Sequence, residues 1–146
     1  MGACFFFLLI AHHVSHLTSV ESALMISRTE QTFVLIGAGG ISKAYAQAFE
    51  QSSDVELVAV ADVRPDAAEA VANTCGCKSY GSHEQMLKES TFDAAIVCTP
   101  PITHPEICNE LLDKGIHVLC EKPLAIDSVS AKSMIDAATK SGAKFT

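Results

Sequence analysis

A glycine-rich turn and an acidic residue farther along the chain are the first residues whose types and spacing indicate a chemistry. Gly37-Ala-Gly-Gly-Ile-Ser42 follows an apolar, strand-like run and opens a segment of helical periodicity. Gly37 permits a tight turn, and Gly39, which has no Cβ, lets the backbone approach a diphosphate. Free N–H groups and the positive dipole at the helix start could then bind that anion. Asp62 ends the next strand-like run, where a carboxylate accepts hydrogen bonds from a ribose. The pattern predicts a dinucleotide-binding turn.

The residues around Asp62 bear on which dinucleotide would fit. A carboxylate there accepts hydrogen bonds from the ribose hydroxyls of NAD and repels the 2′-phosphate of NADP, so NAD is favoured. Arg64 lies two residues on and could offset that repulsion, which leaves NADP as the alternative. Ser42 stands where the pattern has Gly or Ala, and we expect it to loosen the packing of helix on strand.

A second candidate segment, Thr99-Pro-Pro101, follows a later strand-like run. A residue before proline is restricted to extended geometry, so this segment must leave the sheet at the carboxyl ends of its strands. Open α/β sheets bind ligands at this edge. His104 is expected in the first turn of the following helix, either near the ligand or as a surface histidine.

A third candidate segment, Glu121-Lys-Pro123, leaves the last predicted strand at the same edge. Lys122 could bond a substrate hydroxyl or the nicotinamide ribose and take part in proton transfer. Pro123 would fix the local backbone, and its peptide bond could be cis. A lysine after a strand is also an ordinary surface residue.

These residues require a scaffold that brings several strand ends together, and the rest of the sequence predicts one. Buried strands are expected at Thr32–Gly37, Val55–Asp62, Phe92–Thr99 and His117–Glu121. Helices are expected between them, with inward residues Ile41, Ala44, Tyr45, Ala48 and Phe49 in the first and Ala131, Met134, Ile135 and Ala138 in the last, Ser128–Ser141. This alternation predicts an α/β fold of Rossmann type, with a doubly wound, mostly parallel sheet and helices on both faces.

Helix ends are also marked in the sequence. Ser82 with Gln85 and Thr103 with Glu106 have the spacing of capping boxes. Pro65 suits the first position of a helix. Two glycines, Gly115 and Gly142, are expected just after helix ends.

Composition excludes several classes of protein. The chain has 146 residues, ten Lys plus Arg, seventeen Asp plus Glu and a net charge of −7, which disfavours nucleic-acid and membrane surfaces. Of its six cysteines, Cys98, Cys108 and Cys120 lie in apolar patterns, so a reduced, cytoplasmic protein is expected. Cys75-Gly-Cys77 has no second pair at ligand spacing, and no metal site is predicted.

Residues 1–30 differ from the rest of the chain. The apolar run Cys4–Ile10, with Val20–Ser22 as a cleavage site, would suit a signal peptide and a secreted protein, but no Lys or Arg precedes it. We therefore favour an N-terminal extension ahead of a domain over residues 31–146. Three histidines in it, His12, His13 and His16, are expected in a solvated tail.

Four segments in order, GAGGIS (37–42), VADVRPDAA (60–68), CTPPITHPE (98–106) and GIHVLCEKPLA (115–125), resemble the N-terminal domain of the Gfo/Idh/MocA oxidoreductases. The resemblance runs from about Thr32 to Thr146. It implies that Lys122 is catalytic and that NAD or NADP is bound by Gly37, Gly39, Gly40, Ile41, Asp62, Arg64, Thr99, Pro100, His104, Glu121 and Lys122.

The resemblance also implies a reaction. Hydride would pass between the nicotinamide and a sugar, cyclitol or related alcohol, and the full-length form would be a homo-oligomer. Family members carry a second α/β domain, so we expect this sequence to be a fragment, truncated at its sixth strand. The alternatives are a stand-alone cofactor-binding domain, an inactive fragment and a non-catalytic NAD(P)-binding sensor or regulator.

Overall fold

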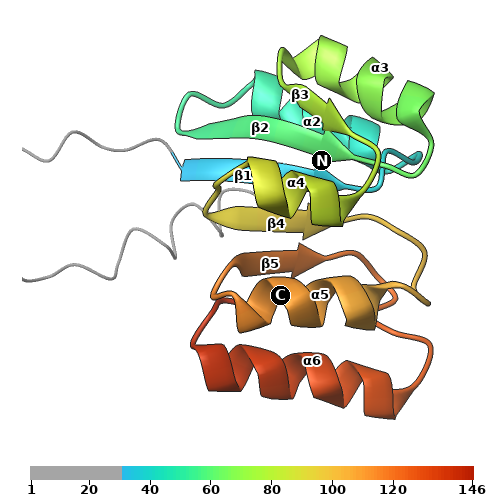
Figure 1. Ribbon diagram of the computed structural model, residues 1–146, viewed down its shortest axis with the longest axis vertical. Coiled ribbons are helices and arrows are strands. Elements are labelled where there is room, and N and C mark those ends of the chain that lie inside the picture. The colour runs from blue at the N-terminus through green and yellow to red at the C-terminus, as the bar shows by residue number, and fades with distance from the viewer. Residues whose placement is uncertain (1–30) are drawn as a thin grey trace, which may run out of the picture.

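A computed structural model describes residues 31–146, which form one parallel sheet with helices on both faces (Figure 1). The strands are β1 (Gln31–Ile36), β2 (Val55–Ala61), β3 (Lys78–Tyr80), β4 (Ala94–Val97) and β5 (His117–Cys120). Their order is β3-β2-β1-β4-β5, and every described pairing between them is parallel. The doubly wound Rossmann fold predicted from the sequence is confirmed. The predictions for Cys4–Ile10, Val20–Ser22 and the three N-terminal histidines lie outside the described residues.

The helices divide between the two faces of the sheet, as Figure 1 shows. They are α2 (Ser42–Glu50), α3 (Pro65–Cys75), α4 (His83–Glu89), α5 (His104–Asp113) and α6 (Ser128–Ser141). One apolar cluster joins the sheet to α2 and α3, and the other joins it to α4, α5 and α6. No helix in this part of the chain is long and apolar enough to cross a bilayer.

The central strand β1 supplies both clusters because alternate side chains of a strand point to opposite faces. Val34 and Ile36 lie in the cluster under α4 and α5, whereas Phe33 and Leu35 lie in the cluster under α2 and α3. A strand segment buried on both faces is apolar throughout, which is why Phe33–Ile36 is a continuous apolar run. β3 is short and mostly exposed, so it lacks such a run.

Two helix faces differ from the prediction. In α2 the buried residues are Ser42, Ala46 and Phe49, while Ile41 precedes the helix and is 45% exposed. The fully buried face of α2 therefore differs from the predicted one, and the two share only Phe49. In α6 Met134 is buried but Ile135 is 51% exposed, because α6 packs mainly on α5 and only a narrow stripe is covered.

The predicted helix ends are mostly confirmed. Ser82 Oγ accepts the Gln85 N–H, Pro65 is the first residue of α3, and Gly142 follows α6 at φ +76°. The capping box at Thr103 is wrong, because its backbone is already helical and its hydroxyl lies 2.8 Å from Pro100 O instead. A capping side chain needs an extended backbone to reach the N–H groups of the first turn.

The last residues form an isolated parallel bridge to β5. Phe145 forms a parallel bridge to Val118, whose N–H donates to Lys144 O at 2.8 Å. The N–H of Cys120 donates to Thr146 O at 2.8 Å. A further strand at this place stays a prediction, with this bridge in its support.

The described cysteines, Cys75, Cys77, Cys98, Cys108 and Cys120, are free thiols. Burial raises the pKa of Cys75 and Cys77, which keeps both protonated at neutral pH. Within residues 31–146, no three His, Cys, Asp or Glu side chains lie close enough together to hold a metal ion.

Candidate dinucleotide-binding cleft

The glycine-rich turn lies where the strand order reverses, between β1 and β4. Gly37 has φ +98°, a conformation that side chains disfavour, and a Cβ there would lie 2.7 Å from the carbonyl carbon of Cys98. Its N–H donates to Ala61 O at 2.8 Å, and Cys98 N donates to Ile36 O at 2.7 Å. Glycine is thus required at this position both by the turn and by the close passage over the end of β4.

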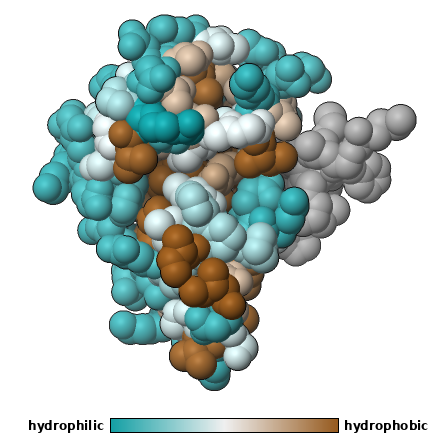
Figure 2. Space-filling view, turned by 90° about the vertical axis from the view of Figure 1, so that its right-hand side faces the viewer, coloured by the Kyte–Doolittle hydropathy of each residue, from teal (hydrophilic) through white to brown (hydrophobic). Residues whose placement is uncertain are grey.

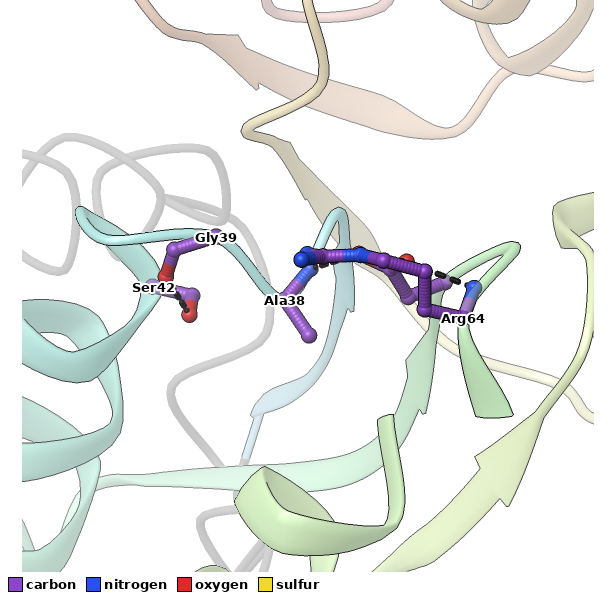
Figure 3. A network of polar contacts seen from close by, with 5 residues as sticks. Ala38, Gly39, Ser42 and Arg64 are labelled. Carbon is purple, nitrogen blue, oxygen red and sulfur yellow. Dashed lines mark hydrogen bonds and ion pairs between the residues drawn. The ribbon is translucent and has the colours of Figure 1, made fainter. Parts of the chain in front are cut away.

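The turn leads into α2 with its backbone donors available. The N–H groups of Gly39, Gly40 and Ile41 make no hydrogen bond to the chain as far as the structure describes it. Ser42 is fully buried, and its Oγ donates to Gly39 O at 2.5 Å (Figure 3). Ser42 is therefore packed inside the domain and stabilises the turn by a hydrogen bond, so the expectation that it loosens the packing of helix on strand is wrong. Three free donors at a helix start are the arrangement with which helix N-termini bind anions in other proteins.

Asp62 faces this turn from the end of β2. Its Oδ2 accepts the N–H of Ala38 at 2.7 Å, and its Oδ1 accepts the N–H of Arg64 at 2.8 Å. The Arg64 guanidinium also contacts the carboxylate, with Nε 3.2 Å from Oδ1 (Figure 3). Burial opposes ionisation of Asp62, but the hydrogen bonds from Arg64 and Ala38 outweigh it and hold its pKa below the ordinary value. The carboxylate is therefore charged and fixed beside the turn.

A cleft of about 730 Å³ opens at this edge of the sheet. The predicted site residues that line it are Gly37, Gly39, Asp62, Arg64, Thr99 and Pro100. Its wall is completed by residues that were not predicted, among them Val63, Ser82, His83, Glu84, Thr103 and Glu106. Ser82 to Glu84 follow β3, and the mostly polar sequence of that strand gave no signal that they end at the same edge. The space is suited in size to a ligand of nucleotide dimensions.

His104 is neither a surface residue nor part of the cleft wall, so the structure agrees with neither interpretation of the sequence. It is fully buried, with Nε2 2.7 Å from Thr99 O and Nδ1 3.1 Å from Leu124 O. Its ring thus joins the loop after β4 to the loop after β5. The sequence placed it in the first turn of a helix, and only the packing of the two loops shows that it points inward.

Glu121 and Lys122 lie outside the lining of that cleft, on the neighbouring loop after β5. Glu121 N donates to Val97 O at 2.9 Å, and Glu121 Oε1 accepts the Tyr45 hydroxyl at 2.8 Å. The Lys122 side chain is exposed, and the Lys122–Pro123 peptide bond is cis, as the sequence allowed. Tyr45 is a polar partner in this region, whereas its place in the helical pattern predicts only a core residue.

The edge that carries these loops is also partly apolar. Figure 2 views the molecule from the side at which the strand arrows of Figure 1 point, and apolar residues lie exposed there among polar ones. Ile41, Val63, Ile102 and Ile126, which follow β1, β2, β4 and β5, are 45–86% exposed. Exposed apolar side chains around a cleft are typical of a surface that contacts a ligand or another domain.

Strand order, glycine turn and paired carboxylate together define the class of this protein. The order β3-β2-β1-β4-β5, with a glycine-rich turn after β1 and an acidic residue after β2, is that of a dinucleotide-binding Rossmann domain. Comparison with known proteins narrows the class. Residues 31–146 match the family model described as "Oxidoreductase family, NAD-binding Rossmann fold".

The chain belongs to this family, the Gfo/Idh/MocA oxidoreductases, and contains their NAD-binding domain. It is 35% identical to the inositol 2-dehydrogenase of Rhizobium meliloti over 113 residues, 77% of this chain and 34% of that protein. It is 39% identical to the glucose-6-phosphate 3-dehydrogenase of Bacillus subtilis over 106 residues, 73% of this chain and 30% of that protein. The chain thus spans about a third of the length of these relatives.

A solved structure shows the same fold. The WlbA dehydrogenase of Bordetella pertussis, in complex with NADH and UDP-GlcNAcA, superposes with a TM-score of 0.76 at 34% sequence identity. The superposition covers 81% of this chain and 36% of that one. The resemblance stated from the sequence motifs is therefore confirmed by the family model, by sequence relatives and by structure.

Proposed function

We propose that this chain is the cofactor domain of an oxidoreductase that transfers hydride between NAD and a sugar, cyclitol or related alcohol. The observation that carries the proposal is the juxtaposition of three free backbone N–H groups in the turn before α2 with the fixed carboxylate of Asp62. Relatives named for inositol and for glucose 6-phosphate as substrates support the class of alcohol.

Each part of the cofactor has a matching group in the chain. The N–H groups of Gly39, Gly40 and Ile41 would bind the diphosphate, since they combine free donors with the positive end of a helix dipole. Asp62 would accept hydrogen bonds from the adenosine ribose in place of those from the Arg64 guanidinium. Val63, 86% exposed in the cleft wall, offers an apolar surface to a planar base. When bound, the nicotinamide supplies the hydride-transfer chemistry.

The charges around the cleft favour NAD over NADP. Asp62 is ionised, and two further carboxylates, Glu84 and Glu106, line the same cleft. The nearby cation, Arg64, is already paired with Asp62 at 3.2 Å. An additional 2′-phosphate would meet more negative than positive charge, which disfavours its binding.

Lys122 is the residue of this domain that we propose as catalytic. Its exposed ammonium group lies on the loop after β5, at the same sheet edge as Thr99 and Pro100. A lysine in this position could donate a hydrogen bond to the substrate hydroxyl and orient it for proton transfer. The cytoplasmic location, supported by the free thiols, and a homo-oligomeric full-length form stay predictions.

Calorimetry with the 146-residue chain tests the binding part of this proposal. We expect NADH to bind, NADPH to bind at least about tenfold more weakly, and Asp62→Asn to lose at least about tenfold in NADH affinity, since hydrogen bonds to charged groups contribute about 1.5–3 kcal/mol. Asp66→Asn is the matched control, because Asp66 is exposed in the first turn of α3 outside the cleft. Folded wild-type protein that takes up neither nucleotide would overturn the proposal.

A further inference from the structure

A hydrogen bond between α2 and the loop after β5 joins two parts of the site that the sequence separates widely. The Tyr45 hydroxyl donates to Glu121 Oε1 at 2.8 Å, across 76 residues of chain. Tyr45 lies on the helix that begins at the glycine-rich turn, and Glu121 directly precedes Lys122. Both side chains are partly buried, so water competes poorly for this bond.

The second oxygen of the same carboxylate holds the backbone of the lysine. Glu121 Oε2 accepts the N–H of Lys122 at 3.0 Å, while the N–H of Glu121 donates to Val97 O in β4 at 2.9 Å. The backbone N–H of Glu121 is thus bonded to the sheet, and the backbone N–H of Lys122 is bonded to the Glu121 carboxylate. The orientation of that carboxylate depends on whatever binds its other oxygen.

Tyr45 is suited to be a permanent donor in this arrangement. Burial, followed by the hydrogen bond to Glu121, raises the pKa of Tyr45 well above its ordinary value, so the phenol keeps its proton. The nearby Cys98 thiol also stays protonated, because burial and the charge of Glu121 raise its pKa. The phenol therefore keeps its proton at neutral pH and donates it to Glu121.

We propose that Tyr45 is a positioning residue for Lys122. It fixes the Glu121 carboxylate, the carboxylate fixes the Lys122 N–H, and the lysine thereby keeps a set position relative to the helix that starts at the diphosphate-binding turn. Tyr45 acts through Glu121 and is not itself catalytic. The inference deepens the proposed function and rests on it for the role of Lys122, but the geometric link can be tested without any nucleotide.

Amide hydrogen exchange measured by NMR on the full chain tests the link. In Tyr45→Phe, which keeps the ring and removes only the hydroxyl, we expect the Lys122 amide to exchange at least about tenfold faster. Tyr80→Phe is the matched control, since it removes the other described tyrosine hydroxyl, which lies 2.8 Å from Ser90 Oγ. Tyr80→Phe should leave Lys122 exchange unchanged, and an equal acceleration in both variants would overturn the proposal as general loosening.

A double-variant cycle tests whether Tyr45 acts through Glu121. Glu121→Ala removes both acceptor oxygens, so we expect it to accelerate Lys122 exchange by itself. If the link is correct, Tyr45→Phe combined with Glu121→Ala is no faster than Glu121→Ala alone, and effects that multiply would overturn it. If Tyr45→Phe does not fold, Glu121→Ala still tests the link, because unchanged Lys122 exchange in Glu121→Ala also refutes it.

Added NADH separates this inference from the proposed function. With NADH saturating, we expect the shift of the Lys122 amide signal to be smaller in Tyr45→Phe than in the wild type, while the shift at Gly39 is retained. Equal Lys122 shifts in the two proteins would overturn the positioning role and leave nucleotide binding intact. No shift at Gly39 in the wild-type chain would instead overturn the proposed function, whatever the exchange rates show.

Discussion

Asp62 has a structural role as well as a place in the cleft. Its carboxylate accepts the N–H of Ala38 in the glycine-rich turn and the N–H of Arg64 before α3, so one side chain joins the ends of β1 and β2. These bonds stabilise the charged form and lower its pKa despite partial burial. A group with a lowered pKa stabilises the fold above its unfolded pKa, about 3.9, and this stability is lost as pH falls through its folded value.

Replacement of Arg64 should therefore change the acid sensitivity of the domain. In Arg64→Ala we expect the pKa of Asp62 to rise towards its ordinary value, because the guanidinium contact at 3.2 Å is lost. Stability would then start to fall at a higher pH than in the wild type. A ¹³C NMR titration of the Asp62 carboxyl measures the shift, with Lys132→Ala, which removes an exposed pair with Asp136, as control. An unchanged titration would show that Ala38 and the remaining backbone bond alone set this pKa.

At the scale of elements, α6 shows that an amphipathic pattern alone does not determine which of its apolar residues are buried. Its sequence presents Met134 and Ile135 as equally good core residues, since both lie on one broad helical stripe. In the structure α6 covers α5 rather than the sheet, so Met134 is fully buried and Ile135 is 51% exposed. The choice between neighbouring apolar residues depends on which surface the helix meets.

These two positions make a matched pair for a stability measurement. Met134→Ala should lower the free energy of unfolding by about 2–5 kcal/mol, because it removes a fully buried side chain and leaves a cavity. Ile135→Ala, one residue away on the same helix, should change it by no more than about 0.5 kcal/mol. Urea denaturation measures both values. A large loss at Ile135 would mean that this side chain is covered in solution.

At the scale of the whole molecule, the strand order reverses between β1 and β4, and the candidate binding cleft lies at this same place. The loop after β1 must turn back over the end of β4, and Gly37 is the residue that makes this passage fit. Two positions on, a Cβ at Gly39 would meet no atom of the described chain within 4 Å. Gly37 is therefore required by the fold, whereas the space beside Gly39 is available to a ligand.

Substitutions at the two glycines should consequently have different effects, one on the stability of the domain and the other on NADH binding. Gly37→Ala should destabilise the domain by at least about 2 kcal/mol, since positive φ costs about 1–2 kcal/mol and the clash with Cys98 adds to it. Gly39→Ala should leave unfolding within about 0.5 kcal/mol of the wild type but weaken NADH binding at least about tenfold. Thermal unfolding and calorimetry on both variants check this, and a Gly39→Ala protein with full NADH affinity would contradict it.

Much of the fold and part of the site could be predicted from sequence because they depend on local patterns. β1, β2, β4 and β5 are mostly apolar runs, and the glycine turn and Asp62 follow two of them directly. β3 has no such run, so the cleft wall that follows it was missed. The inward position of His104 was missed because its partners, Thr99 O and Leu124 O, are backbone atoms that no residue type identifies.

The amino-acid sequence by itself determined the alternation of strands and helices, the dinucleotide-binding turn and the family, since each follows from periodicity or from residues close together in the chain. Only the tertiary structure decided which apolar residues are covered and which polar groups meet. The bond between Tyr45 and Glu121 spans 76 residues and exists because parallel strands bring their carboxyl ends to one edge. Such contacts depend on the path of the whole chain, which local sequence does not encode.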